Sequence, residues 1–200
     1  MLIEFWPAAW LTGIILLALV LTGMRRRGRY FLILFSIFWT YILAVVSVTI
    51  FPIPVGGIYG KHGGSELIPF MLRVHALNLM PFYFGNCWEL PNLCARGVAG
   101  NVLMTIPFGF GLNFLTQIKL RKFAWLALSA GVVIETSQLF LDLALGVTYR
   151  TVDINDVIFN TLGAWMGFGL FKAFSWLVRA CQARYDLRGW GFWEYLLTIV

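Results

Sequence analysis

The chain has 200 residues, of which 60% are apolar and only 12% are charged, and its mean hydropathy is +0.81. A water-soluble domain of this length cannot bury so much apolar surface, so the composition excludes an ordinary soluble protein. The formal net charge of +6 comes from short basic clusters between apolar runs, which argues against a nucleic-acid partner and is typical of membrane topology.

The first apolar run predicts a transmembrane helix from Trp6 to Met24. It contains no charged residue and is long enough to cross a hydrocarbon core of about 30 Å at about 1.5 Å per residue. A cleavable signal peptide would carry its positive charges before the run, whereas here Glu4 precedes it and an arginine cluster begins at Arg25. We therefore expect a helix that is retained in the mature protein.

A second uncharged stretch begins at Tyr30, and two prolines follow it. Because proline cannot continue the hydrogen-bond ladder, Pro52 and Pro54 predict that this helix ends near Phe51. The segment 54–96 is then expected to be a loop rather than a second domain.

Two cysteines of this loop, Cys87 and Cys94, are seven positions apart. If the loop is external, oxidation is permitted and a disulfide between them is favoured. A zinc site that also used His62 and His75 is the alternative, but the spacing matches no standard zinc finger, so no metal is predicted.

Three more transmembrane helices are expected, over 97–118, over 123–145, and from the acidic segment 153–156 to Val178. Placing the basic clusters 25–29, 119–122 and 172–188 in the cytoplasm leaves few basic residues outside, so the positive-inside rule predicts an external N-terminus and a cytoplasmic C-terminus. The tail 180–200 is too short to span and is expected in the cytoplasm or at the interface. The predicted fold is therefore an all-α bundle of five transmembrane helices, with residues 1–200 forming a single membrane domain.

Glu135 is interpreted as the ionisable group of the fourth helix, near the bilayer midplane. A central charge costs about 2.5 to 3.5 kcal/mol on insertion scales, so Glu135 should be paired, protonated or exposed to a polar cavity. Gln138 lies on the same helical face. A structural polar contact between helices is the alternative interpretation.

A polar stripe begins the fifth helix. Its carboxylates, amide and glycines recur at intervals of three or four, at Asp153, Asp156, Asn160, Gly163 and Gly167. Asp153 could simply cap the helix, and the glycines favour close helix packing. The adjacent Arg150 could pair with Glu135 or Asp153, or it could bind a phosphate or carboxylate.

The third helix combines Gly100 and Asn101 near its start with Pro107 and Gly109. The amide is a candidate ligand contact, and the proline predicts a bend that frees backbone carbonyls. A kinked packing helix is the alternative.

Taken together, these segments resemble the VanZ-like family of small bacterial membrane proteins, over about residues 30–179. The match rests on 75–170, through Asn78-Leu79-Met80-Pro81-Phe82, Gly100-Asn101, Pro107, Gly109, Glu135, Gln138, Arg150 through Asp153, Asp156, Asn160, Gly163 and Gly167. The resemblance implies a location in the bacterial plasma membrane. It also implies a link to antibiotic resistance, since the founding member is associated with resistance to the glycopeptide teicoplanin.

The leading hypothesis is a non-enzymatic membrane protein that binds an amphiphilic, anionic cell-envelope molecule in an outward-facing cavity. A lipid-linked wall precursor or a lipoglycopeptide would fit. The alternatives are a small transporter and a membrane-embedded enzyme with Glu135 as general base and Arg150 holding a phosphate. The lipid bilayer is the expected partner, and no cofactor is predicted. The candidate ligand-binding residues are Asn78, Asn101, Glu135, Gln138, Arg150, Asp153, Asp156 and Asn160.

Overall fold

The computed structural model describes residues 2–4, 7–54, 67–73, 76–85, 87, 89–146, 148–185 and 191–200. The elements in this part of the chain are the helices α1 (Ala8–Met24), α2 (Arg29–Thr49), α3 (Leu67–Arg73), α4 (Pro91–Leu115), α5 (Leu120–Leu145), α6 (Ile154–Arg184) and α7 (Gly191–Ile199), the 3-10 turn η1 (Arg25–Arg27), and the strands β1 (Leu2–Ile3), β2 (Ile53–Pro54), β3 (Leu77–Asn78) and β4 (Val152–Asp153). The expected helix start at Trp6, the glycine-rich segment 55–66, and His62 and His75 lie outside the described residues.

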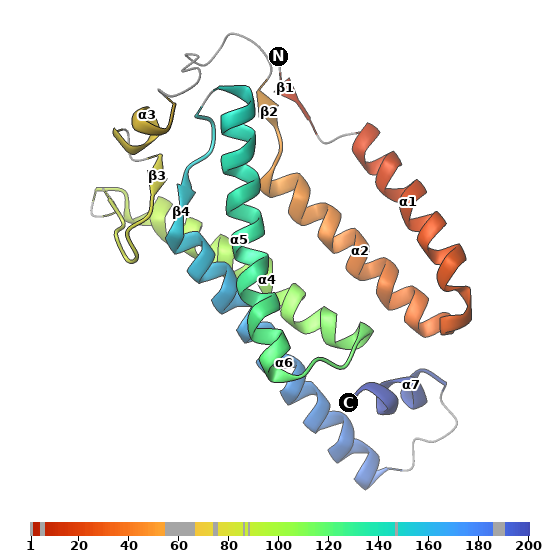
Figure 1. The fold of residues 1–200 in the computed structure, drawn as a ribbon. Coiled ribbons are helices and arrows are strands. Elements are labelled where there is room, and N and C mark those ends of the chain that lie inside the picture. Colours follow the sequence, from red (N-terminus) through yellow and green to blue (C-terminus); the bar gives the residue numbers. More distant parts are fainter. Residues whose placement is uncertain are drawn as a thin grey trace.

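Five of these helices, α1 with η1, α2, α4, α5 and α6, are long and apolar enough to cross a membrane. The prediction of five such helices is therefore confirmed, and their orientation stays a prediction. Figure 1 shows α4, α5 and α6 packed together, with the α1–α2 hairpin at one side. The helices alternate in direction, which brings the short strands to one end of the bundle and the α1–α2 turn and α7 to the other. We call these the strand end and the basic end.

Helix α4 begins earlier than expected, at Pro91 rather than at residue 97. Proline is favoured in the first turn because it has no N–H to leave unpaired there, and the first turn is also tied to Cys87 through its disulfide with Cys94. The predicted loop 54–96 also contains α3 and β3, which pairs in parallel with β4. Backbone pairing between distant segments is not visible in a hydropathy pattern, so the sequence analysis missed these strands.

Local sequence explains where the other helices end. Gly146 adopts a left-handed conformation, with φ of 67°, and caps the C-terminus of α5. Asp153 caps α6 because its side chain accepts a hydrogen bond from Asn155 N. Helix α6 continues to Arg184, beyond the predicted end at Val178, which is its last buried residue. In the extension, partly buried Gln182 accepts a hydrogen bond from Trp193 Nε1 of α7 at 2.6 Å.

The closest helix contact joins α4 and α6 through glycines. An added Cβ would lie 1.8 Å from Ala164 O at Gly109, 2.2 Å from Val102 O at Gly163, and 2.0 Å from Ile106 O at Gly167. No side chain fits at these positions, so the two backbones touch directly, as small residues allow in membrane helices. Fully buried Ala164 and Phe123 continue this core toward α5.

Helix α7 packs on the basic end of the bundle. Its buried Leu196 joins Phe114 of α4 and Phe171 of α6 in one apolar cluster. Tyr195 Oη donates to Phe114 O at 2.9 Å, and the Tyr195 ring lies 6.1 Å from that of Tyr30 at the start of α2. The C-terminal tail is therefore a docked helix that connects α2, α4 and α6.

Candidate functional site: a polar cavity between two helices

The C-terminal end of α2 is held by side-chain donors from α5 and from the turn before β4. The bonds are Arg150 Nη2 to Val48 O (3.2 Å) and Phe51 O (2.7 Å), Tyr149 Oη to Ile50 O (2.7 Å), and Gln138 Nε2 to Thr49 O (3.1 Å). The last carbonyls of a helix have no partner within it, and leaving them unpaired in an apolar surrounding is costly. These donors satisfy them, and the arginine charge suits the negative end of the helix dipole.

Burial raises the pKa of the Tyr149 phenol, although the neighbouring Arg150 guanidinium opposes the shift. The phenol therefore stays protonated near neutral pH and keeps donating to Ile50 O. Arg150, which the sequence analysis treated as a partner for Glu135, Asp153 or a ligand, instead bonds the backbone of α2 within the described part of the chain.

A second network surrounds the start of α6. Asn78 Nδ2 donates to Asp153 Oδ1 at 2.9 Å, and Asn155 Oδ1 accepts from Phe82 N at 2.6 Å. Both amides also donate to Tyr83 O, at 3.0 and 2.8 Å. Asn78 and Asp153 therefore fasten the segment before α4 to α6. Asn155 does the same, but it lies off the predicted stripe and sequence reasoning did not select it.

Glu135 is 5% exposed, and its Oε2 accepts a hydrogen bond from Asp153 N at 3.0 Å. The carboxylates of Asp153 and Asp156 lie close enough to repel it. This placement supports the alternative interpretation, a polar contact between α5 and the start of α6. It also means that at least three acidic groups share the strand end of the bundle.

Asp142 is a further ionisable group of α5 that sequence reasoning overlooked. It is fully buried, and its Oδ1 accepts from Tyr149 N at 3.4 Å. Its spacing of seven from Glu135 places both on one helical face, which is the pattern that could have revealed it. Asn160 is also fully buried, and neither of its side-chain atoms has a partner among the described residues.

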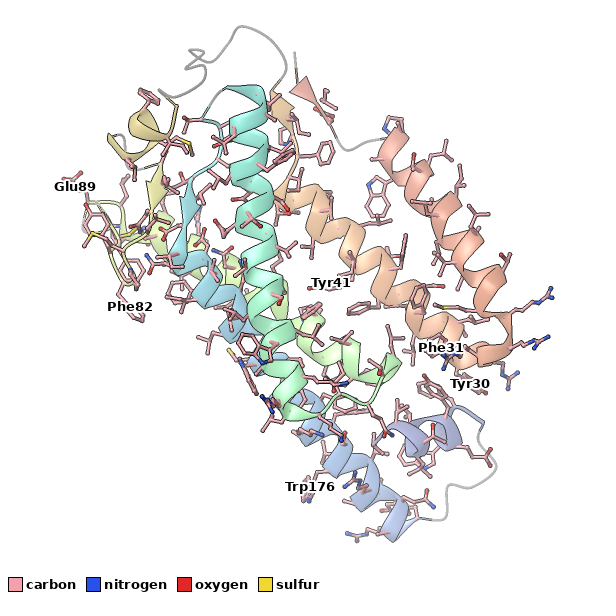
Figure 2. The ribbon with its side chains drawn as sticks, viewed as in Figure 1. Tyr30, Phe31, Tyr41, Phe82, Glu89 and Trp176 are labelled. Atoms are coloured by element: carbon pink, nitrogen blue, oxygen red, sulfur yellow. A yellow bond between two sulfur atoms is a disulfide. The ribbon has the colours of Figure 1, made fainter. Side chains whose placement is uncertain are left out.

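A cavity of about 590 Å³ opens between α2 and α4 near the strand end. Its polar lining comes from Tyr41, Thr49, Arg96, Asn101, Gln138, Arg150, Thr151 and Asp156, and its apolar lining from Ala44, Val45, Val48, Leu103, Met104 and Pro107, with Gly97 and Gly100 also lining it. Asn101 and Asp156 interact across it, from α4 and α6. Figure 2 shows Tyr41 reaching from α2 toward the bundle, where its Oη donates to Met104 O at 2.8 Å.

The structure thus divides the predicted ligand-binding residues between two places. Asn101, Gln138, Arg150 and Asp156 line the cavity, whereas Asn78, Glu135, Asp153 and Asn160 lie outside its wall. Sequence reasoning missed Tyr41, Thr49, Arg96 and Thr151. The sequence predicts Arg96 in a loop, and the early start of α4 brings it to the cavity rim.

Gly97 and Gly100 differ from the packing glycines. A Cβ added at either position would meet nothing within 4 Å, although both positions line the cavity. These two glycines therefore leave open space beside the polar groups instead of allowing two helices to touch.

Five described helices that are long and apolar enough to cross a membrane define this chain as a multi-pass helical membrane protein. The model of one protein family, VanZ/LLP1, matches residues 38–177, which is well over half of the chain, so the chain belongs to the VanZ/LLP1 family. This confirms the family resemblance derived from the sequence, and the matched range includes every residue that lines the cavity. Comparison with curated proteins and comparison with solved structures each found no match.

Proposed function

We propose that this protein binds an amphiphilic, anionic cell-envelope molecule in the cavity between α2 and α4. The observation that supports the proposal is the composition of the cavity wall. The wall carries Arg96, Arg150 and the Asn101 amide, which suit a phosphate or carboxylate, and it has aliphatic surface from both helices. Its other polar groups are Tyr41, Thr49, Gln138, Thr151 and the acidic Asp156. A membrane-resident molecule with a charged head and an apolar body has the matching distribution of chemistry.

The proposal includes the orientation expected from the sequence. The basic end, with Arg25–Arg27, Lys119–Lys122 and the end of α6, faces the cytoplasm of a bacterial cell, and the strand end faces outward. In this orientation the cavity is open to the outer leaflet and the cell envelope. A lipid-linked wall precursor and the lipid-bearing glycopeptides related to teicoplanin are both ligands of this chemical kind.

Binding is favoured over catalysis by the way the polar groups are used. Glu135, the general base of the enzyme alternative, accepts from Asp153 N and lies outside the cavity wall, whereas Arg150 lines it. The cavity therefore offers an arginine for an anionic group but not the Glu135 carboxylate that the enzyme alternative uses.

The test uses a cavity-filling variant and a matched control. In Gly100→Leu the new side chain of α4 enters the cavity, whereas in Gly169→Leu the new side chain of α6 enters open space outside the cavity wall. Both changes replace a helical glycine with leucine, so their effects on helix propensity are similar. The purified protein is titrated with a long-chain alkyl phosphate while its melting temperature is measured.

We expect ligand-induced stabilisation in the wild type and in Gly169→Leu, and its loss in Gly100→Leu. Arg96→Ala should weaken binding by about fivefold, because an exposed charge pair is worth up to about 1 kcal/mol. Asp156→Asn should strengthen binding, since it removes a negative charge from the cavity wall. Equal stabilisation of Gly100→Leu and the wild type contradicts the proposal.

A cellular measurement tests the resistance role. In bacteria that produce each variant at equal membrane abundance, susceptibility to glycopeptides should rise for Gly100→Leu and stay unchanged for Gly169→Leu. If both variants protect as well as the wild type, the cavity has no part in resistance.

A further inference from the structure

A second, apolar groove continues from the polar cavity along the seam between α2 and α4. It has a volume of about 210 Å³ and is lined by Leu34, Ile37 and Phe38 of α2 and by Phe110, Gly111 and Phe114 of α4. Tyr41 and Pro107 line both the groove and the polar cavity. The two spaces therefore adjoin at these residues and follow one another along the seam, and we call the two together the path.

The meeting point is rigid. Tyr41 Oη is fixed by its hydrogen bond to Met104 O, and the ring lies 5.7 Å from that of Phe38. Pro107 lies inside α4 and supplies no N–H. The polar hydroxyl is thus used inside the protein, and the surfaces that continue into the groove are apolar.

The length and the closed end of the path indicate what it can hold. From Arg96 to Phe114 the path follows α4 for about 27 Å, at about 1.5 Å per residue, which approaches the thickness of a hydrocarbon core. At the basic end, Phe114, Leu34 and Phe110 pack in the cluster that contains Leu196 of α7, so the groove stops there. A helix about 10 Å wide does not fit such a groove, whereas a single hydrocarbon chain does.

We propose that the groove holds the hydrocarbon chain of the ligand whose anionic head occupies the polar cavity. This inference rests on the proposed function and narrows its ligand class to a phosphate lipid with a long chain, taken up sideways from the bilayer between α2 and α4. The α7 cluster closes the far end of the groove and so limits the length of chain that fits.

The experiment maps the chain by photolabelling. The probe is a long-chain alkyl phosphate that carries a diazirine either beside the phosphate or at the far end of the chain, in vesicles of a zwitterionic phospholipid. The labelled peptides are identified by mass spectrometry. The comparison probe is the corresponding long-chain alcohol, which has the same chain and no charge.

Two tryptophan variants make a matched pair on α2. Ile37 and Ile33 are one turn apart and are 61% and 54% exposed, but only Ile37 lines the groove. In the wild type, the far-end diazirine should label the peptide containing Phe110 to Phe114. Ile37→Trp should cause a several-fold loss of that labelling while labelling beside the phosphate is retained, and Ile33→Trp should leave both unchanged.

One outcome overturns the inference while the proposed function stands, namely unchanged far-end labelling in Ile37→Trp. Equal labelling by the uncharged alcohol would indicate ordinary surrounding lipid, and displacement of the probe by inorganic phosphate as effectively as by unlabelled alkyl phosphate would indicate a free phosphate ligand. Either of these two results would overturn the inference together with the anionic amphiphile of the proposed function. If the polar cavity does not bind the charged head, labelling beside the phosphate should persist in Gly100→Leu.

Discussion

The contact between α4 and α6 predicts a large difference between two glycines that lie two positions apart in α6. In Gly167→Ala, the new Cβ would lie 2.0 Å from Ile106 O and 2.8 Å from Phe110 N. Both atoms belong to the backbone of α4, so no side-chain rotation can relieve the overlap, and the helices must separate. Overpacking costs about 1 to 3 kcal/mol, partly offset by about 1 kcal/mol from the better helix propensity of alanine.

The matched control is Gly169→Ala, whose Cβ would meet nothing within 4 Å. Gly169→Ala gains the same helix propensity as Gly167→Ala but has no steric overlap, so the difference in stability between the two variants measures the steric cost alone. Melting temperatures in one detergent should place Gly169→Ala at or above the wild type and Gly167→Ala below it. If Gly167→Ala melts as high as Gly169→Ala, the close helix contact does not stabilise the fold.

The remaining predictions concern orientation and the buried carboxylate. With the exposed Cys181 replaced by serine, a cysteine introduced at exposed Met80 should react with an impermeant thiol reagent in intact cells, and one introduced at exposed Arg26 should not. The reverse labelling pattern would refute the orientation. The Cys87–Cys94 disulfide should persist in the same cells. Glu135→Gln keeps an acceptor for Asp153 N and removes repulsion from Asp156, so its melting temperature should be at least that of the wild type. Glu135→Leu leaves that N–H unpaired and should cost about 1 to 3 kcal/mol, so equal melting of the two variants would count against this role.

The fold was predictable where one local rule decides the outcome. Uninterrupted apolar length identified all five long helices, because crossing a hydrocarbon core requires that length and little else. The glycine spacing at Gly163 and Gly167 likewise indicated a close helix contact, although only the structure identifies α4 as the partner. The early start of α4 and the β3–β4 pairing depend on contacts between distant segments, which no local pattern encodes.

The candidate site was predictable in residue type but not in role. A buried polar group must have a partner, so Glu135, Gln138 and Arg150 were recognisable as costly and therefore important. Which partner each one finds depends on tertiary structure: Arg150 bonds carbonyls at Val48 and Phe51, about a hundred positions earlier in the chain. Local spacing suggested pairing with nearby carboxylates, whereas Arg150 Nη2 donates to carbonyls at the C-terminal end of α2.

The position of the cavity follows from how differently its two walls are fixed. Helix α4 contacts α6 backbone to backbone from Val102 to Phe110, so the middle of this wall is held in place. Helix α2 is fastened by hydrogen bonds at its strand end, through Arg150, Tyr149 and Gln138, and again where Tyr41 reaches Met104 O. Elsewhere along the seam, ring and aliphatic contacts such as that of Phe38 with Phe108 face α4. Such contacts are non-directional, so a hydrocarbon chain can replace them at little cost in a bilayer, where lipid and side chains are equally apolar. The polar cavity lies beside the fastened end of α2 and the apolar groove beside the rest, which is the order in which the head and chain of a membrane lipid would meet them.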